Sequence, residues 1–182
     1  MTSTNAPSKF TVAILPLGDV SDWHIKLTIG VLEQEFGVHV LILPARELPT
    51  EYLDTKNKLY KNRHILNLLL RMLPAEARCI MGIIAGGLQD ENGERQLACA
   101  YTNNKAAVCS VLPAAEWDLV VLNGGQVESD AICYHAIAHE FCHILGLPHC
   151  SNPSCVMHEA FSEITMCTAC RWCAAQKLTN LT

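Results

Sequence analysis

The chain has 182 residues, of which 50% are hydrophobic and 17% charged, so it can form one domain with a large buried core, and disorder and a coiled coil are excluded. Its formal net charge of −5, from 13 Lys and Arg against 18 Asp and Glu, argues against nucleic acid as a partner. The longest apolar stretch, residues 79–88, is about half as long as a bilayer requires, so no membrane partner is expected either.

The N-terminal residues predict a strand followed by a helix. Residues 10–15 form a short apolar run with β-branched side chains that Pro16 ends, as in a buried strand. Across residues 23–36 the apolar side chains recur every three or four positions, which predicts an amphipathic helix. Ser21 or Asp22 can cap the first turn of this helix.

Further strands and helices follow in alternation. A strand at residues 38–43 completes a strand–helix–strand unit, and its crossover favours a parallel pair with the helix packed on the sheet. Residues 62–73 predict a largely buried helix closed by a proline. A third strand is expected at residues 78–85 and an exposed loop at residues 89–96. Two further strands, at residues 97–102 and 106–111, are expected to form a hairpin or two edges of the sheet.

A long helix is expected within residues 128–147, which contain no proline. Ile132, Ala136 and His139 follow one another at helical spacing. Gly146 lies just past the expected end and can adopt a positive φ. This helix carries the residues with the clearest chemistry.

Potential metal ligands are concentrated in one segment. Residues 135–173, 39 of the 182, hold five of the eight histidines and six of the ten cysteines. Residues 1–9 are polar and lack the apolar stretch of a secretory signal, so a cytoplasmic location is expected. Because the cytosol keeps thiols reduced, metal binding explains the clustered cysteines better than disulfides do.

His139, Glu140 and His143 form an HExxH motif. Positions four apart lie about 40° apart around a helix, so both imidazoles can bind one ion while Glu140 lies beside the open coordination position. Gly146 can turn the chain sharply and bring His149 back as a third ligand. The complete pattern, HExxHxxGxxH, is a much more specific signal than HExxH alone.

A zinc ion at these histidines would support the hydrolysis of peptide bonds. Three neutral imidazoles leave zinc its full charge, so it can lower the pKa of a bound water to about 7. The predicted reaction is attack of this water on a peptide carbonyl that the metal polarises. Glu140 acts as the general base and passes the proton to the leaving nitrogen. The sequence identifies no separate donor for the oxyanion.

A second group of ligands follows the third histidine. Cys150 and Cys155 are separated by four residues, and Cys167, Cys170 and Cys173 form two overlapping CxxC pairs. Four thiolates at such spacings suit a closed, tetrahedral structural zinc site. Because the first cysteine adjoins the third histidine, this ion should hold the loop that presents the catalytic ligand.

The remaining histidines and cysteines receive no metal role. His135 shares a helix face with the first histidine of the motif, where packing is commoner than coordination. His158 is ambiguous in the same way. Isolated cysteines in apolar contexts usually behave as small buried hydrophobes, and this applies to Cys79, Cys99, Cys109, Cys133 and Cys142.

Residues 139–157 resemble the archaemetzincin family of zinc metalloproteases, whose pattern is HExxHxxGxxHC, four residues, CxM, a longer spacer and CxxC. Cys155 and Met157 match CxM. The resemblance implies a metzincin-type α/β fold: a mixed, twisted sheet with an active-site helix and a short C-terminal part stapled by zinc. It also implies that the three motif histidines bind the catalytic zinc, that Glu140 is the general base, and that Met157 forms an apolar floor beneath the metal.

The spacer before the last cysteines departs from the family pattern. The family's spacer is longer than the nine residues before Cys167 or the twelve before Cys170 in this chain. The spacer before Cys170 is closer in length to the family's spacer than the one before Cys167. Cys170 and Cys173 are therefore expected to complete the structural zinc site with Cys150 and Cys155. Cys167 paired with Cys170 is the alternative.

These observations predict one zinc metallopeptidase domain over residues 1–182, with two zinc ions per chain and a peptide or protein as substrate. A sheet-and-helix part is expected over about residues 10–147, and a part with the Met-turn and the cysteine site over about residues 148–178. Both an endopeptidase and an aminopeptidase remain open.

Two alternatives compete with this prediction. A deformylase-type enzyme takes an upstream cysteine as its third ligand, but the segments around Cys99 and Cys109 lack the corresponding signature. A two-zinc structural or binding protein with a vestigial protease site is the non-enzymatic alternative. Glu140 argues against it, because a structural site needs no unbound carboxylate beside an open ligand position.

Overall fold

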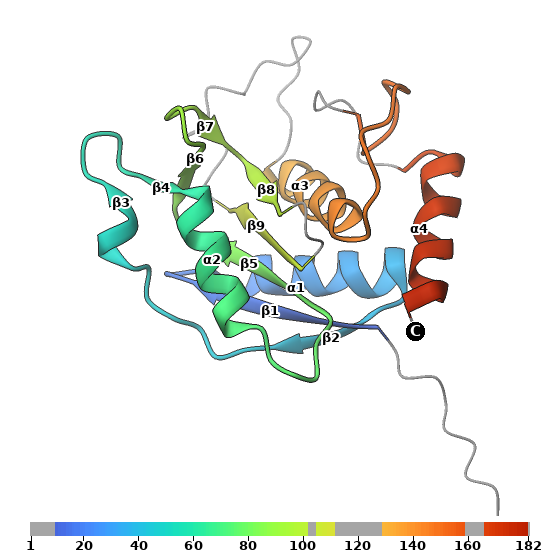
Figure 1. Cartoon of the computed structure of the whole chain (residues 1–182), viewed down its shortest axis with the longest axis horizontal. Helices are drawn as coiled ribbons and strands as arrows, with labels where there is room; N and C mark the ends of the chain where they lie inside the picture. The colour runs from blue at the N-terminus through green and yellow to red at the C-terminus, as the bar shows by residue number, and fades with distance from the viewer. Residues whose placement is uncertain (1–9, 102–104, 112–128, 159–165, 182) are drawn as a thin grey trace, which may run out of the picture.

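The computed structural model describes residues 10–101, 105–111, 129–158 and 166–181, which form two β-sheets with helices packed around them (Figure 1). The larger sheet has five strands, in the order β2 (His39–Ile42), β1 (Thr11–Leu17), β5 (Cys79–Ile84), β9 (Ala106–Ser110) and β8 (Ala98–Ala100). The α-helices of the described ranges are α1 (Asp22–Gly30), α2 (Asn62–Met72), α3 (Ser129–Ile144) and α4 (Thr168–Leu181). Neighbouring strands run parallel except for β8, which is antiparallel to β9, so the predicted mixed sheet of an α/β fold is confirmed.

Strand β1 alternates its side chains between two hydrophobic cores, one on each face of the sheet. Val12 and Ile14 belong to the core that contains α3, whereas Ala13 and Leu15 belong to the core that contains α2. All four side chains are completely buried. A strand covered on both faces requires a continuous apolar run, which is why this segment shows no polar alternation.

Strand β1 does not end at Pro16, as predicted, but continues to Leu17. The backbone N–H and C=O groups of the even-numbered residues of β1 point towards β2. Strand β2 ends at Ile42, which lies opposite Ile14. Beyond that point the carbonyl of Pro16 accepts the backbone N–H of Arg46 at 3.0 Å, and the next N–H on this side is that of Gly18, which donates to the carbonyl of Arg46 at 2.8 Å. The missing N–H of proline therefore leaves no ladder hydrogen bond unmade.

The helix predicted at residues 23–36 forms in two parts. Helix α1 begins after Ser21, whose hydroxyl accepts the backbone N–H of His24 at 3.4 Å, so Ser21 rather than Asp22 is the cap. The chain then follows a wider, π-helical turn, η1 (Val31–Glu35). A π-helical turn contains about one residue more than an α-helical turn. The spacing of apolar residues in the sequence does not reveal where such a turn occurs.

Most other elements before residue 112 form where they are predicted. Strand β2 pairs parallel to β1, and β8 and β9 form the expected antiparallel pair. Residues 102–104 between them lie outside the described residues. The predicted helix at 62–73 and strand at 78–85 correspond to α2 and β5.

The exposed loop expected at residues 89–96 is confirmed for residues 90–94, but both of its ends belong to strands of a second sheet. This sheet has the order β3 (Leu53–Asp54), β4 (Leu59–Lys61), β6 (Gly87–Gln89) and β7 (Arg95–Gln96). Asp90 closes the β6–β7 hairpin by accepting the backbone N–H groups of Asn92 and Glu94, and Gln89 is completely buried. Strands of two or three residues are too short to show the alternation that identifies a strand.

No element is expected at residues 168–181, yet they form α4. Only a narrow stripe of this helix is covered, with Ala174 buried and Cys170 and Leu178 half-buried. A helix is recognised in a sequence by a wider apolar face. Within the described residues, no helix combines the length and the apolar character needed to cross a membrane.

The long helix expected within residues 128–147 is confirmed as α3. It packs on β8 and β9, at one edge of the larger sheet. Figure 1 shows α3 beside β8. The HExxH residues therefore lie next to the strand at the edge of the sheet.

Candidate metal centres

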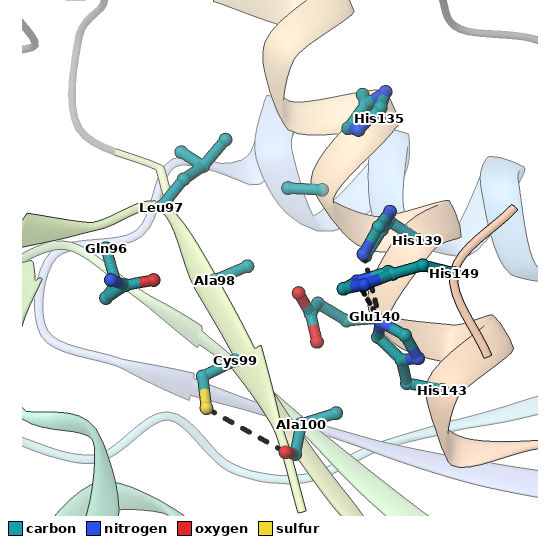
Figure 2. A pocket seen from close by; sticks show the side chains of 11 residues that line it. Gln96, Leu97, Ala98, Cys99, Ala100, His135, His139, Glu140, His143 and His149 are labelled. Carbon is teal, nitrogen blue, oxygen red and sulfur yellow. Dashed lines mark hydrogen bonds between the residues drawn. The ribbon is translucent and has the colours of Figure 1, made fainter. Parts of the chain in front are cut away.

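Helix α3 ends with a turn that brings the chain back towards its own histidines. Gly146 has a φ of 79°, in the left-handed region. Its N–H donates to the carbonyl of His143 at 2.9 Å, and the N–H of Leu147 donates to the carbonyl of Cys142 at 3.0 Å. These two bonds form a Schellman motif, which favours glycine because glycine has no Cβ. The turn expected at Gly146 is confirmed, and it places His149 beside the helix (Figure 2).

The three motif histidines meet at their Nε2 atoms. Nε2 of His143 lies 3.0 Å from Nε2 of His139 and 3.2 Å from Nε2 of His149. Nδ1 of His139 lies 2.8 Å from the carbonyl oxygen of Val156, and Nδ1 of His143 lies 2.8 Å from that of Leu147. A carbonyl can only accept, so both rings carry their proton on Nδ1 and direct an unprotonated Nε2 at a common point.

Unprotonated nitrogens this close together repel one another unless a cation lies between them. Two imidazole ligands of a tetrahedral zinc ion, each about 2.0–2.1 Å from the metal, lie about 3.3 Å apart. The observed separations of 3.0 and 3.2 Å are close to that value. The donor set and its spacing therefore fit a zinc ion.

Burial keeps the imidazoles of His139 and His143 neutral. It lowers the pKa of His139 to about 4, although the hydrogen bond to Val156 acts in the opposite direction. Burial also lowers the pKa of His143. Because neutral imidazole is the form that binds metal, these two ligands can take up a cation at neutral pH without first losing protons.

Glu140 lies beside the histidines without belonging to their ligand group. Figure 2 shows its carboxylate between the three imidazoles and strand β8, and the residue is only 7% exposed. Burial raises the pKa of Glu140 to about 8. A carboxylate whose pKa is close to neutral pH, next to a metal group, has the properties of a general base.

A cleft of about 460 Å³ opens over these side chains, between α3 and β8. The carbonyl of Leu97 and the N–H of Tyr101 bond to β9. Because an antiparallel ladder alternates, the backbone groups of Ala98 and Ala100 face the open edge of the sheet instead. The lining residues are Gln96, Leu97, Ala98, Cys99, Ala100, His135, Ala136, His139, Glu140, His143 and His149. The sequence did not predict that β8 borders the cleft, because no local pattern indicates that this strand lies beside the helix.

Four cysteines form a second group after the third histidine. The Sγ atoms of Cys150, Cys155, Cys167 and Cys170 lie within 4.8 Å of one another, and those of Cys150 and Cys167 are 3.9 Å apart. Two thiolates of a tetrahedral zinc site, each about 2.3 Å from the metal, lie about 3.8 Å apart. The backbone N–H groups of Met157 and Cys167 donate to Sγ of Cys155, at 3.5 and 3.4 Å. The group therefore fits a structural zinc ion.

Cys173 does not lie in this group, contrary to the expectation that it pairs with Cys170. It is exposed on α4, three residues or about 4.5 Å further along the helix axis than Cys170. Cys167, the alternative, comes immediately before α4, and its carbonyl accepts the N–H of Arg171 at 2.9 Å. The first turn of the helix thus brings Cys167 and Cys170 together, and the expected position of Cys173 is corrected.

The other histidines and cysteines lie outside both groups. His135 is buried and its ring stacks on that of His139, with centroids 5.5 Å apart and planes 23° apart, as a packing role requires. His158 is half-buried. Met157, expected beneath the metal, is completely buried. None of the ten cysteines forms a disulfide. Among the five isolated cysteines, Cys99 is half-buried and the other four are buried, namely Cys79, Cys109, Cys133 and Cys142.

The buried carboxyl of Glu140 should make the stability of the metal-free protein depend on pH. Its pKa is about 8 in the folded chain, against an ordinary value of 4.5. Between these values the unfolded chain has lost the proton and the folded chain has kept it, so the free energy of unfolding falls as the pH rises, and it levels off above pH 8. Because each pKa unit corresponds to about 1.4 kcal/mol, we expect Glu140→Gln to be about 3–6 kcal/mol more stable than the parent at pH 9.

Urea denaturation of both metal-free proteins between pH 4 and pH 9 measures this difference. It should shrink towards pH 4, where the carboxyl is protonated in both states. Zinc should also reduce it, because a nearby cation favours the carboxylate. A difference that stays constant across the pH range would contradict the assignment.

Comparison with known proteins gives matches among solved structures. No protein-family model matches the sequence, and no curated protein matches it. An archaemetzincin from Archaeoglobus fulgidus, crystallised with malonate, matches with a TM-score of 0.71 and 24% identity, over 90% of this chain and 99% of that chain. An archaemetzincin from Methanopyrus kandleri matches with a TM-score of 0.75 and 18% identity, over 97% and 99%.

A third solved structure is a zinc-dependent peptidase from Methanocorpusculum labreanum, with a TM-score of 0.67 and 18% identity, over 90% of this chain and 99% of that one. Each of these proteins is covered almost completely, so the likeness extends over the whole architecture and not over the histidine motif alone. The chain therefore has the archaemetzincin fold, as its motifs imply.

Proposed function

We propose that this chain is a zinc-dependent metallopeptidase that hydrolyses peptide bonds. The observation that carries the proposal is the convergence of three histidine Nε2 atoms on one point, those of His139 and His143 unprotonated, with the carboxylate of Glu140 beside them in a cleft. The fold supports the proposal, since a solved structure that shares it is a zinc-dependent peptidase.

Two zinc ions per chain suit the two groups of ligands. His139, His143 and His149 would hold one, and the four clustered cysteines would hold the other as a structural ion. Bound to three neutral imidazoles, zinc supplies Lewis acidity that polarises a carbonyl and lowers the pKa of water.

Glu140 is the residue that would move the proton. Burial, which raises its pKa, makes its carboxylate a stronger base than an exposed glutamate. From its position between the imidazoles and β8, it can accept a proton on the cleft side and then donate it to the leaving nitrogen of a peptide that lies along β8.

Strand β8 would orient the substrate. The backbone groups of Ala98 and Ala100 that point away from β9 can hydrogen-bond an extended peptide as an added strand, which at the Ala100 carbonyl would compete with the 3.8 Å bond from the Cys99 thiol. Their small side chains leave room in the cleft beside α3. A peptide or protein segment in extended conformation is therefore the proposed substrate. Six thiols outside the cysteine group, together with four proposed zinc ligands, suit a reducing compartment and support the cytoplasm as the proposed location.

Digestion of a peptide library with the zinc-loaded protein tests the proposal. Mass spectrometry should detect new peptide termini, which should vanish on treatment with a chelator and return when zinc is added back. The positions of the cuts separate an endopeptidase from an aminopeptidase. Two bound zinc ions without cleavage of any peptide would overturn the proposal and favour a two-zinc structural protein.

A further inference from the structure

Residues 149–157 join the two metal groups. This loop begins with His149 and Cys150, one member of each group, and Cys155 lies near its other end. We propose that the cysteine group positions His139 and His149 through this loop, so that a metal ion bound by the cysteines strengthens metal binding by the histidines. The inference rests on the part of the proposed function that gives each group a metal ion.

The first link runs through the backbone of His149. This residue is exposed, and among the described residues no hydrogen bond to Nδ1 fixes its ring. The next residue, Cys150, donates its N–H to the carbonyl of Met157 at 2.7 Å and places its Sγ 3.9 Å from that of Cys167. The position of His149 therefore depends on how Cys150 is held.

The second link runs through the carbonyl of Val156. It accepts Nδ1–H of His139 at 2.8 Å, which sets the rotation of that ring and keeps Nε2 free for a metal. Val156 directly follows Cys155, whose Sγ accepts the backbone N–H groups of Met157 and Cys167. A shift of Cys155 would therefore move the acceptor that keeps His139 in its metal-binding tautomer.

His143 is independent of this loop. Its Nδ1–H donates to the carbonyl of Leu147, in the glycine turn that ends α3. An empty cysteine group should therefore disturb two of the three imidazoles. Val156 and Met157 are completely buried, so the loop should loosen and not unfold. Loss of a partner that orients a ligand imidazole typically costs about 10–100-fold in metal affinity.

Two of the four cysteines can be replaced without changing a residue of the loop, because Cys167 directly precedes α4 and Cys170 lies in its first turn. The double variant Cys167→Ser with Cys170→Ser empties the cysteine group. We expect the affinity of the histidine group for cobalt to fall by about 10–100-fold. Absorption spectra of the full chain separate the two groups, because only thiolate ligands give charge-transfer bands with cobalt.

Two control variants separate positioning from a general loss of stability. Cys173→Ser removes a thiol from the same helix outside the group, and it should leave the cobalt affinity of the histidines unchanged. Leu69→Ala opens a cavity in the core on the other face of the sheet, where it destabilises the fold without touching the loop. It should also leave the affinity unchanged. Equal affinity in the double variant and the parent, or an equal loss in Leu69→Ala, would overturn the proposal.

A second measurement reports directly on His139. In the parent, NMR should show Nδ1–H of His139 protected from exchange with solvent, and in the double variant this protection should be lost. The single variant Cys170→Ser serves the same purpose if the double variant does not fold. Retained protection with the cysteine group empty would overturn the second link.

Neither the cobalt affinity nor the NMR measurement involves peptide cleavage. A protein that binds both ions and cleaves no peptide would therefore overturn only the peptidase proposal.

Discussion

Replacing Glu140 with glutamine is expected to lower kcat for peptide cleavage by about 10²–10⁴-fold, the usual contribution of a general base, while both zinc ions stay bound. Glutamine has nearly the same shape as glutamate but cannot accept the proton. The carboxylate is absent from the histidine ligand group, so the metal should be retained. Steady-state kinetics and zinc analysis of the same preparation measure both effects.

Glu35→Gln is a suitable control for this prediction. Glu35 is a partly exposed glutamate on η1, outside the cleft, and it forms a 3.5 Å ion pair with Arg171. Its replacement should leave kcat unchanged. A Glu140→Gln protein that kept the parent's kcat would refute the role of Glu140 as a base, and one that lost a zinc ion would make Glu140 a ligand.

Replacing His149 with alanine should lower the zinc content from two ions per chain to one and abolish peptide cleavage. Two imidazoles remain, which is fewer than the three protein ligands that catalytic zinc sites normally have. The remaining ion should be the one held by the cysteines. Elemental analysis after dialysis against a weak chelator, together with the peptidase assay, measures the outcome.

His135→Ala is the matched control for this second prediction. His135 lines the same cleft and stacks on His139, but it is not a member of the histidine group. Its replacement should leave two zinc ions bound. If His135→Ala lost an ion and His149→Ala did not, the proposed ligand set would be wrong.

The convergence of the three histidines could be predicted from the sequence because its geometry is local. Residues four apart on a helix share a face whatever surrounds them. A glycine just past the last turn allows the left-handed backbone that reverses the chain, and Gly146 adopts it. The longer strands were predictable for a similar reason, since a run such as Thr11–Leu17 is apolar along its whole length.

The cysteine group could not be resolved in the same way. Cys167, Cys170 and Cys173 are equally spaced, so the sequence contains two equivalent CxxC pairs. Which pair faces Cys150 and Cys155 depends on where α4 begins and on how it packs against the rest of the chain. The start of the helix at Thr168 places Cys167 and Cys170 towards the loop and leaves Cys173 exposed.

By itself, the sequence determined the chemistry of this protein: imidazoles and thiolates as candidate ligands, a carboxylate beside the first of them, and a helix and a turn that bring the imidazoles together. These features depend on neighbours within a few residues. Only the tertiary structure decided which cysteines complete the cysteine group, which strand borders the cleft, and that the carbonyl of Val156 orients His139. These depend on the packing of segments far apart in the chain, which spacing along the sequence does not encode.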